Sequence, residues 1–221
     1  RDSWTIVKDA KKKGAKVVVI DSYKSRTAKE ADWHICPKPG TDGALAMALI
    51  NHIIYNNLTD LEYINKYTNG FDQLKVHVYE KTPEWASNIT GISIKDIKKL
   101  GTEIATQQPV GIRIGVALER HNGGGQTIRA VTCIPGLTGA WKHVGGGITQ
   151  FPVWEHPYKF DVICRPDWIP KGTRVVNALQ IGRALLGENI DKNIPIKSMM
   201  CWNANPVTQA PETEKIIKGL E

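Results

Sequence analysis

Three short runs rich in apolar residues stand out along the chain, at residues 15–20, 109–117 and 196–201. The first is continuous and mostly β-branched, which is typical of a strand buried on both faces of a parallel sheet. A polar loop follows each run, and long segments with helical spacing separate the runs. The pattern predicts parallel strands that alternate with helices, which is an α/β fold.

Between these runs, apolar positions recur at the spacing of amphipathic helices. Two segments also carry clear start signals: Thr82 precedes Pro83 at a first helical position, and Ser93 precedes Asp96 by three residues. We expect one helix to begin at Thr82 and others to occupy residues 3–13, 42–56, 59–70, 71–80, 93–105, 126–137, 175–186 and 211–219.

This order of elements predicts a Rossmann-like, mostly parallel sheet with helices on both faces. We expect an α/β domain at residues 1–149 and a connection rich in proline and aromatic residues at 150–174. The remainder, residues 175–221, reads as part of a second α/β domain. In such sheets, ligands bind beyond the carboxyl ends of the strands, so the loops there are the candidate site.

Acidic residues stand at the first of these strand ends. Asp21 closes the first run, and Thr41 and Asp42 open the next long helix, with Thr41 as its expected N-cap. An acid at a strand end suits ribose hydroxyls, and an acid in the first turn of a helix suits the N–H edge of a base. The same residues also fit an ordinary capped crossover, so spacing alone leaves both interpretations open.

Glycine-rich and amide-rich loops follow the other two runs. Gly123–Gly125 precedes an expected helix, and glycines there let the backbone approach a ligand closely. A second cluster, Gly145–Gly147, fits a ligand loop or a flexible connector. Asn203 and Asn205 offer donors and acceptors to a polar ligand, or form an Asx-turn before a proline. No GxxxxGK[ST] motif is present, which excludes a P-loop.

The histidines and cysteines do not predict a metal site. His52 falls on the apolar face of its helix, which favours a structural role, and a structural role is also favoured for His121 and His143 in their loops. The cysteines never fall into CxxC spacing, which disfavours a zinc knuckle or a typical iron–sulfur motif. They are Cys36, Cys133, Cys164 and Cys201.

Composition is that of a globular protein, with 41% hydrophobic and 23% charged residues among 221. The net charge of +7 suits a nucleic acid or an anionic cofactor, but no basic stripe interleaved with aromatic residues is present. A nucleic-acid partner is therefore disfavoured. The sequence contains no signal peptide and no apolar run of membrane-spanning length. It begins at Arg1 within an expected helix, so we expect a piece of a longer protein.

Several segments, in the same order along the chain, resemble the molybdopterin oxidoreductases, the bis-molybdopterin guanine dinucleotide or DMSO reductase superfamily. That family includes formate dehydrogenases, nitrate reductases and thiosulfate or polysulfide reductases. The matching segments are Ile20–Asp21, Arg26–Ala28, Ala31–Asp32, Pro39–Leu45, Thr82–Trp85, Ile89–Gly91, Gly115–Arg129, Leu137–Gly139, Gly145–Gly147 and Asn203–Pro206.

The resemblance implies a binding role for particular loops of this chain. The guanosine end of a molybdopterin guanine dinucleotide would be held by Asp21, Ser22, Tyr23, Gly40, Thr41 and Asp42, with Asp42 accepting from the guanine. The pterin would be approached by Gly115, Arg120 and His121. A second dinucleotide would be faced by Asn203 and Asn205. No residue of this chain is predicted to be catalytic or to ligate the metal.

The resemblance also implies parts that this sequence lacks. The family places a [4Fe–4S] motif and the metal-ligating side chain upstream, and a domain that closes over the cofactors downstream. The parent would be a prokaryotic molybdenum or tungsten enzyme of anaerobic respiration, acting on a small molecule by oxygen-atom or formate-type two-electron chemistry. Its expected partners are an iron–sulfur electron-transfer subunit and a membrane-anchor subunit. The isolated fragment is expected to be inactive, and its compartment, cytoplasm or periplasm, is left open.

Two other functions remain open. The same fold serves as a cofactor-free structural and electron-wiring subunit in respiratory NADH dehydrogenases, although the acids and amides at the strand ends favour real cofactor binding. A stand-alone nucleotide-binding module is disfavoured, because no GxGxxG turn follows the first strand.

Overall fold

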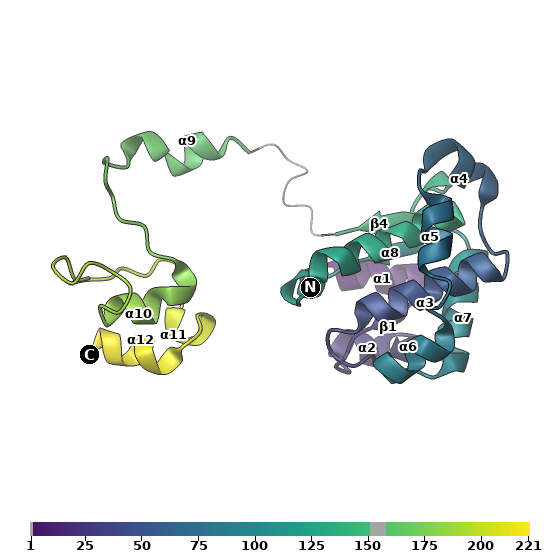
Figure 1. Ribbon diagram of the computed structural model, residues 1–221, viewed down its shortest axis with the longest axis horizontal. Coiled ribbons are helices and arrows are strands. Elements are labelled where there is room, and N and C mark those ends of the chain that lie inside the picture. The colour runs from purple at the N-terminus through teal and green to yellow at the C-terminus, as the bar shows by residue number, and fades with distance from the viewer. Residues whose placement is uncertain (1, 151–157) are drawn as a thin grey trace. The chain divides into compact units, whose positions relative to one another are not determined.

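The computed structural model describes residues 2–150 and 158–221, and the side chains from residue 4 onward within them. The chain forms two compact units, Arg1–His156 and Pro157–Glu221, which we describe separately (Figure 1). The domain boundaries expected at residues 149 and 175 stay predictions. No described helix has the length and apolar character needed to cross a membrane.

All strands of the described residues pair in parallel, as expected for the α/β class. In the first unit, β1 (Val18–Ile20) pairs with β2 (Trp33–Ile35), and β3 (Gly111–Arg113) pairs with β4 (Gly147–Thr149). The fold class is therefore confirmed, although the strands form two short two-stranded sheets.

Three details of the strand prediction are wrong. The first run is not buried on both faces: Val18 and Val19 are half-buried, and Ile20 is 41% exposed. The run at 109–117 pairs over three residues only, since the chain turns into a 3₁₀ helix at Val116. The run at 196–201 forms no strand with any of the described residues, and Met200 within it is 85% exposed. Apolar character alone does not form a strand without a partner for its backbone groups.

Helices make up most of the first unit, and their positions agree with the helical spacing. Thr82 and Ser93 cap two of them, accepting from Trp85 N at 3.2 Å and from Asp96 N at 3.0 Å. The helices are α1 (Asp2–Lys12), α2 (Arg26–Glu30), α3 (Asp42–Tyr55), α4 (Leu61–Tyr67), α5 (Phe71–His77), α6 (Pro83–Thr90), α7 (Ile94–Thr106), η1 (Val116–Arg120), α8 (Gly124–Thr138) and η2 (Ala140–Lys142).

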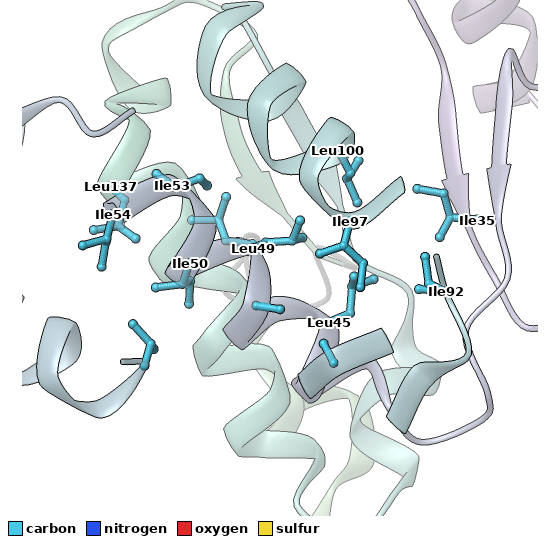
Figure 2. Close-up of a cluster of buried hydrophobic side chains, with 14 of the residues drawn as sticks. Ile35, Leu45, Leu49, Ile50, Ile53, Ile54, Ile92, Ile97, Leu100 and Leu137 are labelled. Carbon is cyan, nitrogen blue, oxygen red and sulfur yellow. The ribbon is translucent and has the colours of Figure 1, made fainter. Parts of the chain in front are cut away.

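Helix α3 is the centre of the core of this unit. It packs against α6, α7 and α8, and its apolar side chains point to all three neighbours. Figure 2 shows Ile97 and Leu100 of α7 on one side of this helix and Leu137 of α8 at another. Ile50 and Ile53 have no exposed surface. A helix that is apolar all round, such as α3, is a core element, and it fixes the position of the loop that precedes it.

The second unit is small and little of it is buried. Among residues 158–221, only Gly182, Ala184 and Ile216 are buried, where α10 packs against α12. The expected helix at 175–186 begins later, because residues 175–177 are non-helical. The elements are α9 (Phe160–Cys164), η3 (Pro166–Trp168), η4 (Ala178–Gln180), α10 (Ile181–Leu185), α11 (Pro206–Gln209) and α12 (Thr213–Leu220).

An ion pair at the start of α4 yields a first prediction. Asp60 accepts from Tyr63 N at 2.9 Å and pairs with Lys142, and these interactions, the Lys142 hydrogen bond foremost, lower the pKa of the Asp60 carboxyl. Asp60→Ala removes the cap and the ion pair, so we expect the free energy of unfolding at pH 7 to fall by about 1–2 kcal/mol. Chemical denaturation measures this change.

The pH dependence of this effect has a definite sign. A lowered pKa in the folded state stabilises the fold above the unfolded pKa, about 3.9, and this contribution is lost as the pH falls through the folded value. The difference between Asp60→Ala and wild type should therefore shrink in acid. Asp9→Ala is the matched control, because its pair with Lys12 is exposed and should contribute almost nothing. An equal loss in both variants would contradict the prediction.

Candidate functional site

The turn after β1 carries the first predicted site residues. Asp21 is half-buried, Ser22 is exposed and Tyr23 is 71% exposed. Asp21 N donates to Ile35 O at 3.0 Å, and Asp21 Oδ1 accepts from Tyr23 N at 3.1 Å. This Asx-turn leaves Oδ2 of Asp21 without a partner among the described residues, so one carboxylate oxygen is available to a ligand.

Two side chains at the end of β2 hold the backbone of the same turn. His34 Nε2 lies 2.8 Å from Asp21 O, and Cys36 Sγ donates to Ser22 O at 3.3 Å. Neither residue was among the predicted site residues, because the apolar pattern does not predict β2. The signal in the sequence that could have identified this strand is the alternation of residue character around Ile35. The Ile35 side chain is 3% exposed, whereas the side chains of its two neighbours, His34 and Cys36, face the turn.

The loop before α3 carries the second group of site residues. Thr41 stands at the N-cap position but its side chain does not cap the helix, which corrects the expectation. Its hydroxyl instead donates to Lys38 O at 2.6 Å, closing a turn in which Gly40 has φ of 78°. Asp42 is half-buried in the first turn of α3. Its backbone N–H has no partner among the described residues, so the helix start is open to a polar ligand.

A third loop, between η1 and α8, meets the second. A Cβ added to Gly40 would lie 3.4 Å from His121 Nδ1, so the imidazole of His121 lies against the Gly40 turn. Just inside the two helices, a Cβ on Gly43 would lie 3.0 Å from Thr127 Oγ1. The N-terminal ends of α3 and α8 are therefore side by side. Of the predicted residues, Gly40 and His121 are thus brought together by the fold itself.

The glycines of the candidate loops fall into two classes. A Cβ on Gly124 would lie 2.7 Å from Glu119 Cα, so this glycine is needed for η1 to pack on α8. Around Gly115, whose φ is −84°, and around Gly125, no atom lies within 4 Å of an added Cβ. Packing and a left-handed backbone therefore do not explain these two glycines, and the space beside them is open.

Two glycines of the cluster Gly145–Gly147 have a structural role. An added Cβ on Gly146 would clash with Ala140 O, and one on Gly147, where φ is 99°, would enter the ring of Trp141. Close packing against η2 explains both residues. Of the two interpretations left open by the sequence, a ligand loop or a flexible connector, neither describes these contacts.

The remaining predicted residues are exposed. Arg120 ends η1, and its guanidinium has no partner among the described residues. Asn203 and Asn205 belong to the second unit, where Asn203 has φ of 51°. Asn205 precedes α11 without a side-chain cap, and its N–H donates to Gln209 Oε1 at 3.0 Å. Both asparagine side chains are free of partners among the described residues, so neither forms the Asx-turn that the sequence allowed.

Two titratable residues near these elements have structural roles. Asp32 accepts from Val17 N at 2.8 Å and pairs with Lys11, and these contacts lower the pKa of its carboxyl and fix the start of β1. His52 is buried between Thr102 and Asn56, at 2.9 and 3.1 Å, and burial lowers the pKa of its imidazole. The predicted structural role of His52 is confirmed.

Comparison with known proteins identifies the family. Residues 3–221 match the model of the molybdopterin oxidoreductases. The chain belongs to this family. It is 40% identical over 217 residues to the probable oxidoreductase YoaE of Bacillus subtilis, which covers 98% of this chain and 31% of YoaE. It is 32% identical over 225 residues to the probable dimethyl sulfoxide reductase chain YnfF of Escherichia coli, covering 86% and 27%.

A solved structure supports the same family. Acetylene hydratase from Pelobacter acetylenicus matches with a TM-score of 0.62 and 30% identity, over 66% of this chain and 20% of that one. The family expected from the motifs is confirmed, and membership implies a molybdenum or tungsten pterin cofactor. The chain spans less than a third of the length of each of these relatives.

Proposed function

We propose that this molybdopterin oxidoreductase chain binds the guanosine end of a molybdopterin guanine dinucleotide, as part of a longer catalytic subunit. The observation that carries the proposal is the bonding of the Asp21 turn to the end of β2, from which the chain runs on to Asp42 at the start of α3. Main-chain and side-chain bonds tie the Asp21 turn to residues 34–36, and six residues further along the chain Asp42 opens α3. Both acids are half-buried, with groups free for a ligand.

The chemistry of these residues fits a guanine nucleotide. The free carboxylate oxygen of Asp21 accepts from ribose hydroxyls, and Asp42 accepts from the N–H edge of guanine. Tyr23 and Ser22 border the ribose, and Gly40 with Thr41 lets the backbone approach the base. Adenine presents an acceptor, N1, beside its N6 amino donor, so it cannot give Asp42 the two adjacent donors, N1–H and N2–H, that guanine offers.

The open space beside Gly115 and Gly125 fits the pterin part. A side chain would fill this space without any clash inside the chain, so its absence leaves room for a bound group. Arg120 and His121 border the same loop and suit the polar edge of a pterin. Asn203 and Asn205, with free amides, suit a second dinucleotide. When bound, the metal–pterin group supplies two-electron redox chemistry, while these residues bind and orient it.

The proposal extends to the protein that contains this chain. This chain covers 31% of YoaE and 27% of YnfF, which supports a longer parent. From the motif resemblance, we propose that these residues form the middle of its catalytic subunit, with a [4Fe–4S] cluster held elsewhere. YnfF is named as one chain of a reductase, which supports a parent that assembles with other chains. We propose that these partners are an iron–sulfur subunit and a membrane-anchor subunit. The isolated chain would bind nucleotide without turnover.

A charge-neutral variant tests the guanine contact. Asp42→Asn replaces an acceptor that guanine N–H groups favour, so we expect the affinity of the chain for GMP to fall about tenfold or more, as measured by calorimetric titration. Inosine monophosphate lacks the 2-amino group, so wild type should bind it more weakly than GMP, and the variant should lose this preference.

The control for this variant is Asp72→Asn. Asp72 also stands in the first turn of a helix, α5, but belongs to none of the candidate loops. It should leave the affinity for GMP unchanged. If both variants bind GMP as tightly as wild type, the guanine contact is refuted. If both bind GMP more weakly than wild type by the same factor, the loss is a general effect of charge and not of the Asp42 contact.

A further inference from the structure

The backbone of the Asp21 turn accepts hydrogen bonds from two side chains that are not among the proposed ligand-binding residues. The carbonyl groups of two successive residues each accept from the end of β2: Asp21 O from His34 Nε2 at 2.8 Å, and Ser22 O from Cys36 Sγ at 3.3 Å. The Asp21 N–H is bonded to Ile35 O. Three consecutive residues, 34–36, therefore bond to the Asp21 carbonyl and to the main-chain groups that precede and follow it, Asp21 N–H and Ser22 O.

The His34 bond has a definite direction. A carbonyl oxygen only accepts, so Nε2 of His34 carries the hydrogen and donates. His34 is half-buried and pairs in register with Val19 of β1, so its backbone is fixed by the sheet and its ring reaches the turn from a rigid element. Rigid support of this kind sets the geometry of a binding group more precisely than a loop can.

The consequence is an oriented carboxylate. With its N–H and its carbonyl both bonded, Asp21 has little freedom about its own backbone, and Tyr23 N takes Oδ1. Oδ2 is the carboxylate oxygen that has no partner among the described residues, and it is available to a ligand. If the His34 bond is removed, the carbonyl of Asp21 loses its partner on β2, and the direction of the carboxylate is less tightly fixed.

We propose that His34 is a positioning residue for Asp21, and that it sets the ability of this chain to recognise ribose hydroxyls. The inference rests on the proposed function, because it assumes a guanosine bound at the Asp21 turn. His34 acts through the Asp21 carbonyl and does not contact the nucleotide.

The test compares two nucleotides that differ only in the ribose. GMP and 2′,3′-dideoxyguanosine monophosphate are titrated into the chain, and the ratio of their affinities reports the ribose contact alone. Wild type should favour GMP about tenfold, and Asp21→Asn should reduce this ratio severalfold. His34→Leu, which fills the space without a donor, should reduce the ratio to the same extent. His34→Gln, whose amide restores a donor, should recover most of it.

Several readouts separate positioning from a general loss of stability. The preference for GMP over inosine monophosphate depends on Asp42 and should persist in His34→Leu. Circular dichroism and a melting curve establish that each variant is folded. His77→Leu, on the exposed end of α5, is the matched control and should keep the wild-type ratio.

The outcomes are distinguishable. A wild-type ratio near one would overturn the ribose role of Asp21, and the positioning role with it. A high wild-type ratio that His34→Leu leaves intact, or that His34→Gln does not recover, would overturn the positioning role while the proposed guanosine site stands. Parallel loss in His34→Leu and Asp21→Asn, with recovery in His34→Gln, supports both.

Discussion

Ile53→Ala should lower the free energy of unfolding of the first unit by about 2–5 kcal/mol, as measured by denaturant titration. Ile53 has no exposed surface and lies in α3 among side chains of the neighbouring helices (Figure 2). Removing its outer carbons leaves a cavity that close-packed neighbours refill only in part. Because α3 begins at Asp42, we also expect weaker nucleotide binding near the denaturation midpoint.

The matched control is the same substitution at an exposed isoleucine. Ile6 lies on α1 and is 72% exposed, so Ile6→Ala removes little buried surface. It should change the free energy of unfolding by no more than about 0.5 kcal/mol. Comparable losses in the two variants would show that α3 is not the centre of the core.

Gly124→Ala should lower the free energy of unfolding by about 1–3 kcal/mol and disturb the loop that leads to His121. The added Cβ would lie 2.7 Å from Glu119 Cα, and closer still to Leu118 O. Both are backbone atoms of η1, so the clash is relieved only by moving that element. Since His121 follows η1 and lies against Gly40, the contact between two candidate loops is expected to loosen.

Gly125→Ala is the control that separates packing from binding. Its Cβ meets no atom within 4 Å, and alanine favours a helix more than glycine does by up to about 1 kcal/mol. Stability should therefore be unchanged or higher. In the full-length protein, the same Cβ would enter the space assigned to the pterin, so cofactor content should fall. Equal destabilisation by the two alanines would contradict the packing of η1, and full cofactor content in Gly125→Ala would contradict the assigned space.

The helices of the first unit were predictable because their signals are local. Thr82 with Pro83 and Ser93 with Asp96 specify helix starts through a few neighbouring atoms, and the structure has caps at both. Strands were harder, because a strand exists only through its partner. The run at 196–201 has the composition of a strand but pairs with nothing described, whereas Trp33–Ile35 is short and became a strand through β1.

Details of the candidate site depended on contacts that sequence spacing does not encode. Thr41 has the residue type of a cap, yet its hydroxyl bonds to Lys38 O three residues earlier in the chain. The meeting of Gly40 with His121 joins segments about eighty residues apart and follows from the crossing of α3 and α8. The motif resemblance located the loops, but only the structure assigned Gly124 to packing and left Gly125 open.

Metal and pterin analysis of the full-length protein, purified anaerobically from a host that makes the cofactor, tests the central claim most directly. We predict molybdenum or tungsten together with pterin, and release of GMP on acid hydrolysis. Loss of the GMP in Asp42→Asn, but not in Asp72→Asn, would assign it to the loops described above. A protein that is folded but free of metal, pterin and GMP would contradict the claim and favour a cofactor-free structural subunit built on the same fold.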